Sequence, residues 1–288
     1  RRRGDRGMSN DKSIVQHQKI NDDEAIVITR NGKHQYKFHR VFDMTRGRTA
    51  DSELMPGVTT LAKHVGGDNF SIAMNWGLKQ VRRSALLRLG IDADSLDSLD
   101  SDAFKKAWEA VKDNQFLTSD MEAPKRSGTE AREIGEKLHQ DIDSFIKNPN
   151  APQAEDNDLF MLWHRELGSH KWVASEQFLV NTQYGYGGTA DAISLEPDGF
   201  AIWDWKTKSP GYTSRPSELA QITAYALAME SMDHPLTPVK AFIANIMRDG
   251  SGIDITPVDI SPVGHNAKLF FVGRDMYHAL RNAKGGKE

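Results

Sequence analysis

Apolar residues follow two different spacings along this chain, and the change between them falls near Trp172. Before Trp172 the pattern is mainly helical, with apolar side chains three or four residues apart. After it, they alternate with polar ones as in strands. Two earlier β-rich runs, Ala25–Thr29 and His34–Phe38, flank the dipeptide Asn31-Gly32. Because Asn-Gly is typical of the type I′ turn, a β-hairpin is predicted to precede the helical part.

One predicted helix has a clear apolar face. The predicted helices are residues 59–90, with a break near 66–67, and residues 103–113, 129–147 and 154–167. On the third of these, four apolar side chains fall within about 40° of Leu138, namely Ala131, Ile134, Ile142 and Phe145. His139 lies about 100° from Leu138, at the edge of this stripe. Its imidazole can therefore reach a cleft while the helix stays packed.

The second part of the chain predicts a sheet. The predicted strands are residues 172–180, 189–195, 200–206, 239–247 and 253–258, with one helix over 217–230 and another from Pro262. Gly185–Gly188 and Pro197-Asp198-Gly199 are strong turn signals between the first three strands. The order of elements predicts a mixed α/β fold in which helices flank a central sheet.

Three regions are expected along the chain. Residues 1–10 are interpreted as a flexible arm or a cloning remnant, because Arg1–Gly7 precede Met8 and lack the apolar core of a signal peptide. Residues 11–120 are expected to form the hairpin and a helical region. Residues 121–288 are expected to form the α/β core.

Composition narrows the class of protein. Hydrophobic residues make up 38% of the 288 residues, enough for a core without disulfides. The chain has no cysteine, which excludes zinc–thiolate sites, iron–sulfur clusters and cysteine nucleophiles. No apolar run is long enough to cross a bilayer, so we expect a soluble protein without a membrane partner. The absence of cysteine fits a reducing compartment, and we expect a cytoplasmic location.

The formal net charge of −3 restricts how the chain could bind nucleic acid. A protein that coats DNA usually has a basic surplus, so any DNA contact here needs a local basic strip. The candidates are Lys79, Arg82, Arg83, Arg88, Lys125, Arg126 and Arg132. For any one of them, a solvated helix face is the simpler interpretation.

The residues that point to chemistry lie on two successive predicted strands. Asp204 and Lys206 share one face of their strand, while Trp203 and Trp205 face the other way. If the strand that begins near Asp191 pairs with this one as a hairpin, the two aspartates approach each other. Two carboxylates that close repel, so a hard divalent cation such as Mg²⁺ or Mn²⁺ is their natural partner.

Such an arrangement is suited to phosphodiester hydrolysis. A divalent ion on carboxylates lowers the pKa of bound water and neutralises charge in the transition state. A lysine two residues from a metal-binding carboxylate can position that water or contact the phosphate. Alone, Asp-x-Lys also describes an ordinary ion pair on an exposed strand. The preceding Gly-Gly-Thr-Ala-Asp spacing favours the catalytic interpretation.

Several motifs occur in an order that resembles the RecB-type branch of the PD-(D/E)XK nucleases. These are Gly135-x-x-x-His139, Glu176, Tyr186-Gly187-Gly188-Thr189-Ala190-Asp191, Asp204-Trp205-Lys206 and Gln221-x-x-x-Tyr225. Met55-Pro56-Gly57-Val58-Thr59-Thr60 is similar to a segment of mitochondrial genome maintenance exonucleases and their phage-encoded relatives, although Gly57 stands where those often have Ser. The resemblance implies a PD-(D/E)XK core with an N-terminal hairpin and helical extension.

The resemblance also implies roles for individual residues. His139, Asp191 and Asp204 would bind the metal, with the Trp205 carbonyl nearby. Lys206 would be the catalytic lysine and Glu176 a supporting carboxylate. The expected substrate contacts are Gln221, Tyr225, Thr207, Lys208 and Arg132. The expected cofactor is Mg²⁺ or Mn²⁺, and the lack of cysteine excludes the iron–sulfur cluster of some relatives.

Three functions are compatible with these motifs. The first is a metal-dependent exonuclease that acts from DNA ends in recombination, repair or phage genome processing, with DNA and a single-strand annealing or recombination protein as partners. The second is a sequence-specific or structure-specific endonuclease. The third is a DNA-binding module that does not cleave. Polarity, strand preference and oligomeric state stay open.

Overall fold

The computed structural model describes residues 13–19, 24–42, 48–65, 123–150 and 154–283. The chain divides into two compact units, Arg1–Gly66 together with Leu138–Glu288, and Gly67–Lys137. In the second unit, the described residues are those that begin helix α5 (Ala123–Lys147). The predicted helix at 103–113, most of the one at 59–90, and the basic residues from Lys79 to Arg88 lie outside the described residues. The predicted limits at residues 10 and 120 stay predictions.

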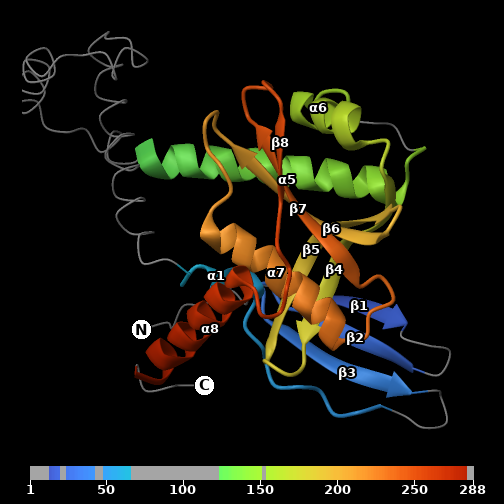
Figure 1. Cartoon of the computed structure of the whole chain (residues 1–288), viewed down its shortest axis with the longest axis vertical. Helices are drawn as coiled ribbons and strands as arrows, with labels where there is room; N and C mark the ends of the chain where they lie inside the picture. The colour runs from blue at the N-terminus through green and yellow to red at the C-terminus, as the bar shows by residue number, and fades with distance from the viewer. Residues whose placement is uncertain (1–12, 20–23, 43–47, 66–122, 151–153, 284–288) are drawn as a thin grey trace, which may run out of the picture. The chain divides into compact units, whose positions relative to one another are not determined.

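The first unit is built on a five-stranded mixed sheet, which confirms the predicted mixed α/β fold (Figure 1). Its strands, in spatial order, are β4 (Lys171–Asn181), β5 (Tyr186–Glu196), β6 (Gly199–Lys208), β7 (Pro238–Met247) and β8 (Ile253–Pro257). Strands β6 and β7 are parallel and the other pairs are antiparallel. A parallel pair needs a crossover connection, and helix α7 (Pro216–Ser231) provides it.

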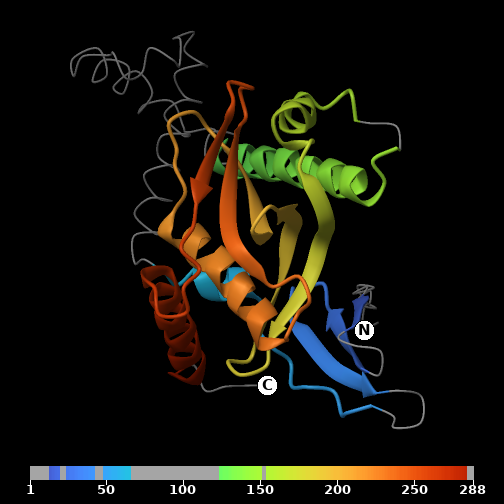
Figure 2. The same ribbon diagram turned by 45° about the vertical axis from the view of Figure 1, so that its right-hand side comes forward.

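Helices cover both faces of this sheet (Figures 1 and 2). On one face, α7 packs with α1 (Val58–Ala62) and α8 (His265–Ala283) against β-strand residues such as Ile202. On the other face, α6 (Asp158–Leu167) and residues 138–147 of α5 pack against Trp203 and Trp205. Burial on both faces leaves few places where a polar side chain of the sheet can reach a ligand. None of the helices in the described ranges is both long and apolar enough to span a membrane.

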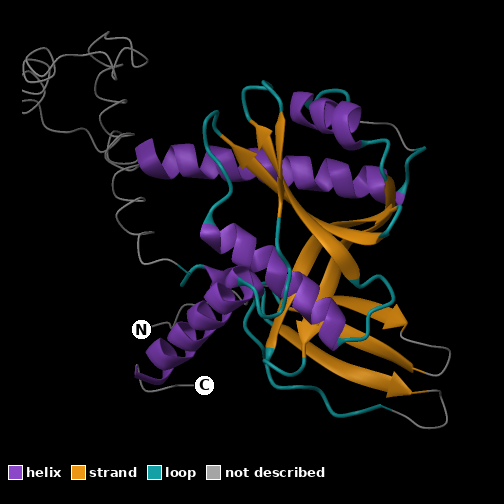
Figure 3. Cartoon of the chain, viewed as in Figure 1, coloured by secondary structure: helices purple, strands orange, loops and turns teal. Residues whose placement is uncertain are grey.

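A second, three-stranded sheet precedes the core (Figure 3). It is antiparallel, in the order β1 (Ile14–Lys19), β2 (Glu24–Arg30) and β3 (Tyr36–Phe42). The hairpin of β2 and β3 is confirmed, but the predicted two-residue type I′ turn is wrong. The Asn31 carboxamide oxygen accepts hydrogen bonds from the backbone N–H of Lys33 and of Gln35, each at 3.0 Å. His34 takes the positive φ, of 53°, so the Asn31 side chain organises a longer loop.

Several predicted boundaries shift for local reasons. The helix expected from Ala154 begins at Asp158, because the Asn157 side chain accepts a hydrogen bond from the Phe160 N–H at 3.3 Å and caps the first turn. The helix expected from Thr129 begins at Ala123, and the C-terminal helix begins at His265 rather than Pro262.

Candidate metal centre

The candidate site lies where strands β5 and β6 separate. Their antiparallel pairing runs from Glu196 and Gly199 to Ala192 and Trp203 and ends there. The predicted hairpin is therefore confirmed. Asp191 and Asp204 are the next residue on each strand past the last pair. The Asp191 carboxylate accepts a hydrogen bond from the Trp205 N–H at 2.7 Å, which satisfies a donor that the separating strands leave unpaired.

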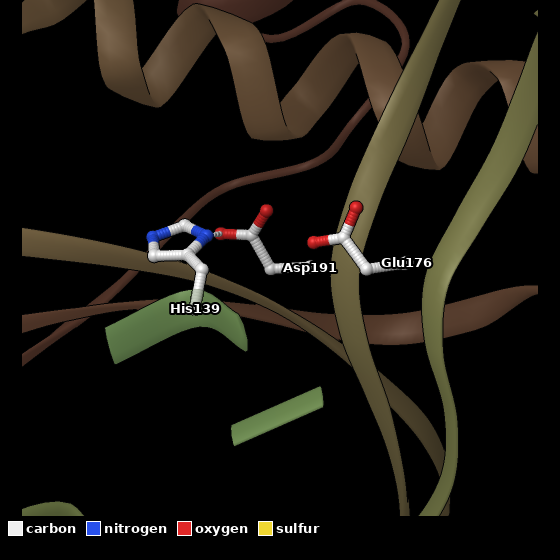
Figure 4. A group of neighbouring side chains, drawn as sticks. All are labelled: His139, Glu176 and Asp191. Carbon is white, nitrogen blue, oxygen red and sulfur yellow. Dashed lines mark ion pairs between the residues drawn. The ribbon is translucent and has the colours of Figure 1, made fainter. Parts of the chain in front are cut away.

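Three side chains from three elements meet at this point (Figure 4). His139 from α5, Glu176 from β4 and Asp191 from β5 each offer one ligand atom, and these atoms lie within 4.8 Å of one another. Asp191 lies between the other two, with its Oδ2 3.7 Å from Nδ1 of His139. The other ring nitrogen of His139 lies 3.1 Å from the Trp205 carbonyl oxygen. One imidazole with carboxylate and carbonyl oxygens is a donor set that suits a divalent ion.

Glu176 has an uncommon backbone conformation for a strand residue. It lies opposite Asp191, between the pairs Ser175–Ala192 and Gln177–Ala190, and its φ is 48°. A residue with a Cβ is strained in this left-handed region. Burial, followed by the charge of Asp191, raises the pKa of the Glu176 carboxyl to about 7. The strain and the raised pKa thus occur at one residue of the cluster.

Asp204 and Lys206 form an ion pair beside this cluster, in which only the Asp204 side chain is buried. Asp204 is fully buried, and Lys206 Nζ contacts its Oδ2. Burial raises the pKa of Asp204, the Lys206 charge opposes that rise, and Asp191 adds to it. Burial lowers the pKa of Lys206, but the carboxylates of Asp204 and Asp191 outweigh it and raise the pKa overall. Lys206 is therefore a cation at neutral pH.

Gln221 of helix α7 links Asp204 to Tyr225 of the same helix. The Gln221 Nε2 donates to the Tyr225 hydroxyl at 2.8 Å and to Asp204 Oδ1 at 3.4 Å. The two residues lie one turn apart on the same helix face, as predicted. Burial raises the pKa of Tyr225 well above its usual value, Asp204 and Asp191 add to this, and a hydrogen bond with Thr59 opposes it. The Met55–Thr60 segment therefore also lies at the site.

The glycines before Asp191 have a different role from the predicted bend. Strand β5 begins at Tyr186, so Asp191 lies within the strand and not at its start. A Cβ on Gly187 would lie 2.5 Å from Cγ of Tyr36, and a Cβ on Gly188 would overlap Cε1 of Tyr225. The two glycines therefore make room for one tyrosine on each face of the strand. Gly57 is similar, because a Cβ there would lie 2.6 Å from the His34 carbonyl oxygen.

Two of the predicted substrate contacts, Lys208 and Thr207, are not brought to this cluster. The Lys208 ammonium is bound by both carboxylate oxygens of Glu218, at 2.5 and 2.8 Å. Thr207 follows Lys206 on β6, so its side chain faces away from that of Lys206. Arg132 belongs to the second unit, where it pairs with Glu136 at 3.4 Å. Their contacts with substrate stay predictions.

Two residues near the site were not found from sequence. Arg30 and Tyr36 belong to the N-terminal sheet, yet both reach Thr189 on β5. No motif marks either residue, because each ends or begins an ordinary hairpin strand. Their place depends on how the two sheets pack, which local spacing does not encode.

Comparison with known proteins supports the predicted superfamily. Residues 157–270 match the model of the PD-(D/E)XK nuclease superfamily, a span that contains Glu176, Asp191, Asp204 and Lys206. No curated protein matches the chain. The solved structure described as "Crystal structure of SSO0001" is 15% identical over 54% of this chain and 69% of that chain, with a TM-score of 0.29, too low to support an argument. The mixed sheet flanked by helices is consistent with the PD-(D/E)XK fold, and the superfamily indicates a metal-dependent nuclease.

Proposed function

We propose that this chain is a divalent-metal-dependent deoxyribonuclease of the RecB type, an exonuclease that acts from DNA ends. The observation that carries the proposal is the meeting of His139, Glu176 and Asp191 beside the Asp204–Lys206 ion pair. These groups come from α5, β4, β5 and β6. Their convergence at the point where β5 and β6 separate brings three carboxylates together, and a divalent cation would offset their mutual repulsion.

The ion would be held by His139, Asp191 and Asp204, with the Trp205 carbonyl beside them. Mg²⁺ or Mn²⁺ suits a set in which oxygen donors dominate. When bound, such an ion supplies an activated water and neutralises charge on the phosphate. Burial raises the pKa of Asp204 and the charge of Asp191 adds to that rise, which supports a cation close to the two carboxylates.

The other residues would position the substrate and the protons. The Lys206 ammonium, kept charged by two carboxylates, would stabilise negative charge on the phosphate oxygens. Glu176, whose pKa is raised to about 7, would exchange a proton with water near neutral pH. Gln221 holds Asp204 by a hydrogen bond and, with Tyr225, would contact the DNA backbone.

Action from ends is supported by the segment Met55–Thr60. It resembles exonucleases in sequence, and it lies at the site, since Gly187 donates its N–H to the Pro56 carbonyl at 3.1 Å. We place the enzyme in the cytoplasm, in recombination, repair or phage genome processing, with a single-strand annealing or recombination protein as a partner.

The test compares end-labelled linear DNA with covalently closed circles in Mg²⁺ and in Mn²⁺. We expect loss of linear DNA, intact circles, and activity reduced about 10³-fold or more in Asp204→Ala and in Lys206→Ala. Asp198→Ala is the matched control, because Asp198 lies in the exposed turn between the same two strands. Wild-type activity in both site variants would overturn the nuclease assignment. Discrete fragments from closed circles would replace the exonuclease with an endonuclease.

A further inference from the structure

Arg30 links the N-terminal sheet to the strand that carries Asp191. Its guanidinium donates to the Thr189 hydroxyl at 3.3 Å and lies 4.9 Å from the centre of the Phe178 ring. The Tyr36 hydroxyl lies 3.0 Å from the same Thr189 oxygen. One face of the guanidinium is therefore covered by an aromatic ring, and one edge meets a pair of hydroxyl groups.

This group of residues lies one step along the strands from the metal cluster. Thr189 precedes Asp191 by two residues on β5, so the two side chains share a face about 6–7 Å apart. Phe178 follows Glu176 by two residues on β4. The positive charge of Arg30 acts on Glu176 and opposes the rise in its pKa. One nucleotide of an extended strand can bridge such a separation.

The chemistry of this group favours a phosphate. Arg30 has five N–H donors in a planar fork that matches phosphate oxygens. In the described part of the chain, no carboxylate lies within ion-pair distance of it, and its neighbours are hydroxyls and a ring. Glu176, Asp191 and Asp204 next to it would repel DNA. A nearby cation would offset that repulsion where the backbone enters.

We propose that Arg30, Thr189 and Tyr36 form a subsite for the phosphodiester next to the one that is cleaved. The inference rests on the proposed nuclease function and adds a substrate contact from the N-terminal sheet. In this subsite, the Arg30 guanidinium binds two phosphate oxygens, while the Thr189 and Tyr36 hydroxyls hold one edge of the guanidinium in place. The subsite would position the strand for the metal centre without taking part in bond cleavage.

The test measures binding separately from cleavage. The 288-residue chain carrying Asp204→Asn is titrated with short oligonucleotides in which single linkages are replaced by uncharged methylphosphonate. We expect Arg30→Gln to weaken binding of unmodified DNA about tenfold and to reduce the slope of log affinity against log salt by about 0.7–0.9. At the linkage that Arg30 contacts, a methylphosphonate should weaken binding by the protein with Arg30 and should have no further effect on the Arg30→Gln variant. The reason is that the methylphosphonate and the Arg30→Gln substitution remove the same contact.

The matched control is Arg274→Gln. Arg274 is also stacked on an aromatic ring, 5.8 Å from the centre of Tyr184, and donates to a carbonyl at 2.9 Å, but it lies on α8. Arg274→Gln should leave unchanged the set of linkages at which methylphosphonate weakens binding. Arg30→Lys keeps the charge and should restore the slope of log affinity against log salt. A defect in folding would instead lower the midpoint of thermal unfolding in both Arg30 variants.

The outcomes separate the subsite from the nuclease function. The subsite proposal would be overturned if proteins with and without Arg30→Gln bind DNA with equal affinity. It would also be overturned if the losses of affinity from Arg30→Gln and from methylphosphonate add independently at every linkage, even if cleavage is normal. A wild-type chain that binds DNA with the expected pattern but never cleaves it would support the subsite and contradict the nuclease.

Discussion

Glu176 shows at the scale of one residue how the candidate centre departs from ordinary strand structure. Its φ of 48° lies in the left-handed region, and its carboxyl is partly buried, with Glu176 opposite Asp191 on the neighbouring strand. Strained backbone persists only where the surrounding structure imposes it, and it is concentrated at functional sites. The strain here positions a carboxylate within the cluster that also contains His139.

Replacing Glu176 by glycine should stabilise the protein relative to alanine. Both variants lose the carboxylate, but only glycine adopts this φ without strain. After the greater flexibility of glycine in the unfolded chain is included, we expect Glu176→Gly to exceed Glu176→Ala by about 1 kcal/mol in free energy of unfolding. Urea denaturation without divalent ions measures this. Equal stabilities would show that the conformation at residue 176 is not strained.

Sequence reasoning at this scale succeeded where strand alternation decides the geometry. It identified Asp204 and Lys206 on one face and Trp203 and Trp205 on the other. It did not foresee the left-handed backbone of Glu176, because tertiary contacts impose that conformation and no glycine marks it. It also assigned Gly187 and Gly188 to a bend, although they accommodate tyrosine rings from elsewhere in the chain.

At the scale of elements, the edge of β4 is covered by side chains rather than by a strand. The Gln16 carboxamide oxygen accepts from the Phe178 N–H at 2.5 Å and from Gln177 Nε2 at 3.1 Å, and its Nε2 donates to the Glu176 carbonyl at 3.3 Å. Gln18 donates to the Phe178 carbonyl. These bonds satisfy backbone groups that an edge strand would otherwise leave open.

Replacing Gln16 by leucine should therefore weaken the core. The partly buried N–H of Phe178 and carbonyl of Glu176 would lose these partners, at a cost of about 1–3 kcal/mol in free energy of unfolding. Amide exchange at Phe178 should also accelerate. His17→Leu is the matched control, since His17 is exposed on the same strand. If the two variants unfold alike and the Phe178 amide stays protected, the edge does not depend on Gln16.

The same contacts explain which elements could be predicted. Strands β4 to β8 and helix α7 follow clear apolar patterns, and all were predicted within a few residues. Strand β1 was missed because its inward side chains are glutamines while Ile14 and Val15 are exposed. A strand that presents amides to its neighbour lacks the pattern by which buried strands are recognised.

At the scale of the whole molecule, a bound ion should stabilise the fold. The cluster joins α5, β4 and β5, which are distant in sequence, so an ion that binds only the folded chain shifts the unfolding equilibrium. At a free concentration of 100 times its dissociation constant, Mn²⁺ should add about 2.7 kcal/mol. Thermal unfolding with Mn²⁺ and with EDTA measures the difference.

Asp191→Ala should abolish that difference, and Asp198→Ala in the exposed turn should preserve it. A shift of equal size in both variants would mean that Mn²⁺ stabilises the protein from another location.

The tryptophans that pack around β6 should report ion binding at the candidate metal centre through their absorption and fluorescence. Trp163, Trp172, Trp203 and Trp205 contact one another, with ring centres 5.5 to 5.8 Å apart in each contact. Trp205 also contributes the N–H bound by Asp191 and the carbonyl beside His139. Occupancy of the cluster should therefore change near-ultraviolet ellipticity and emission without any attached dye, and stopped-flow fluorescence could time ion entry in the unlabelled protein.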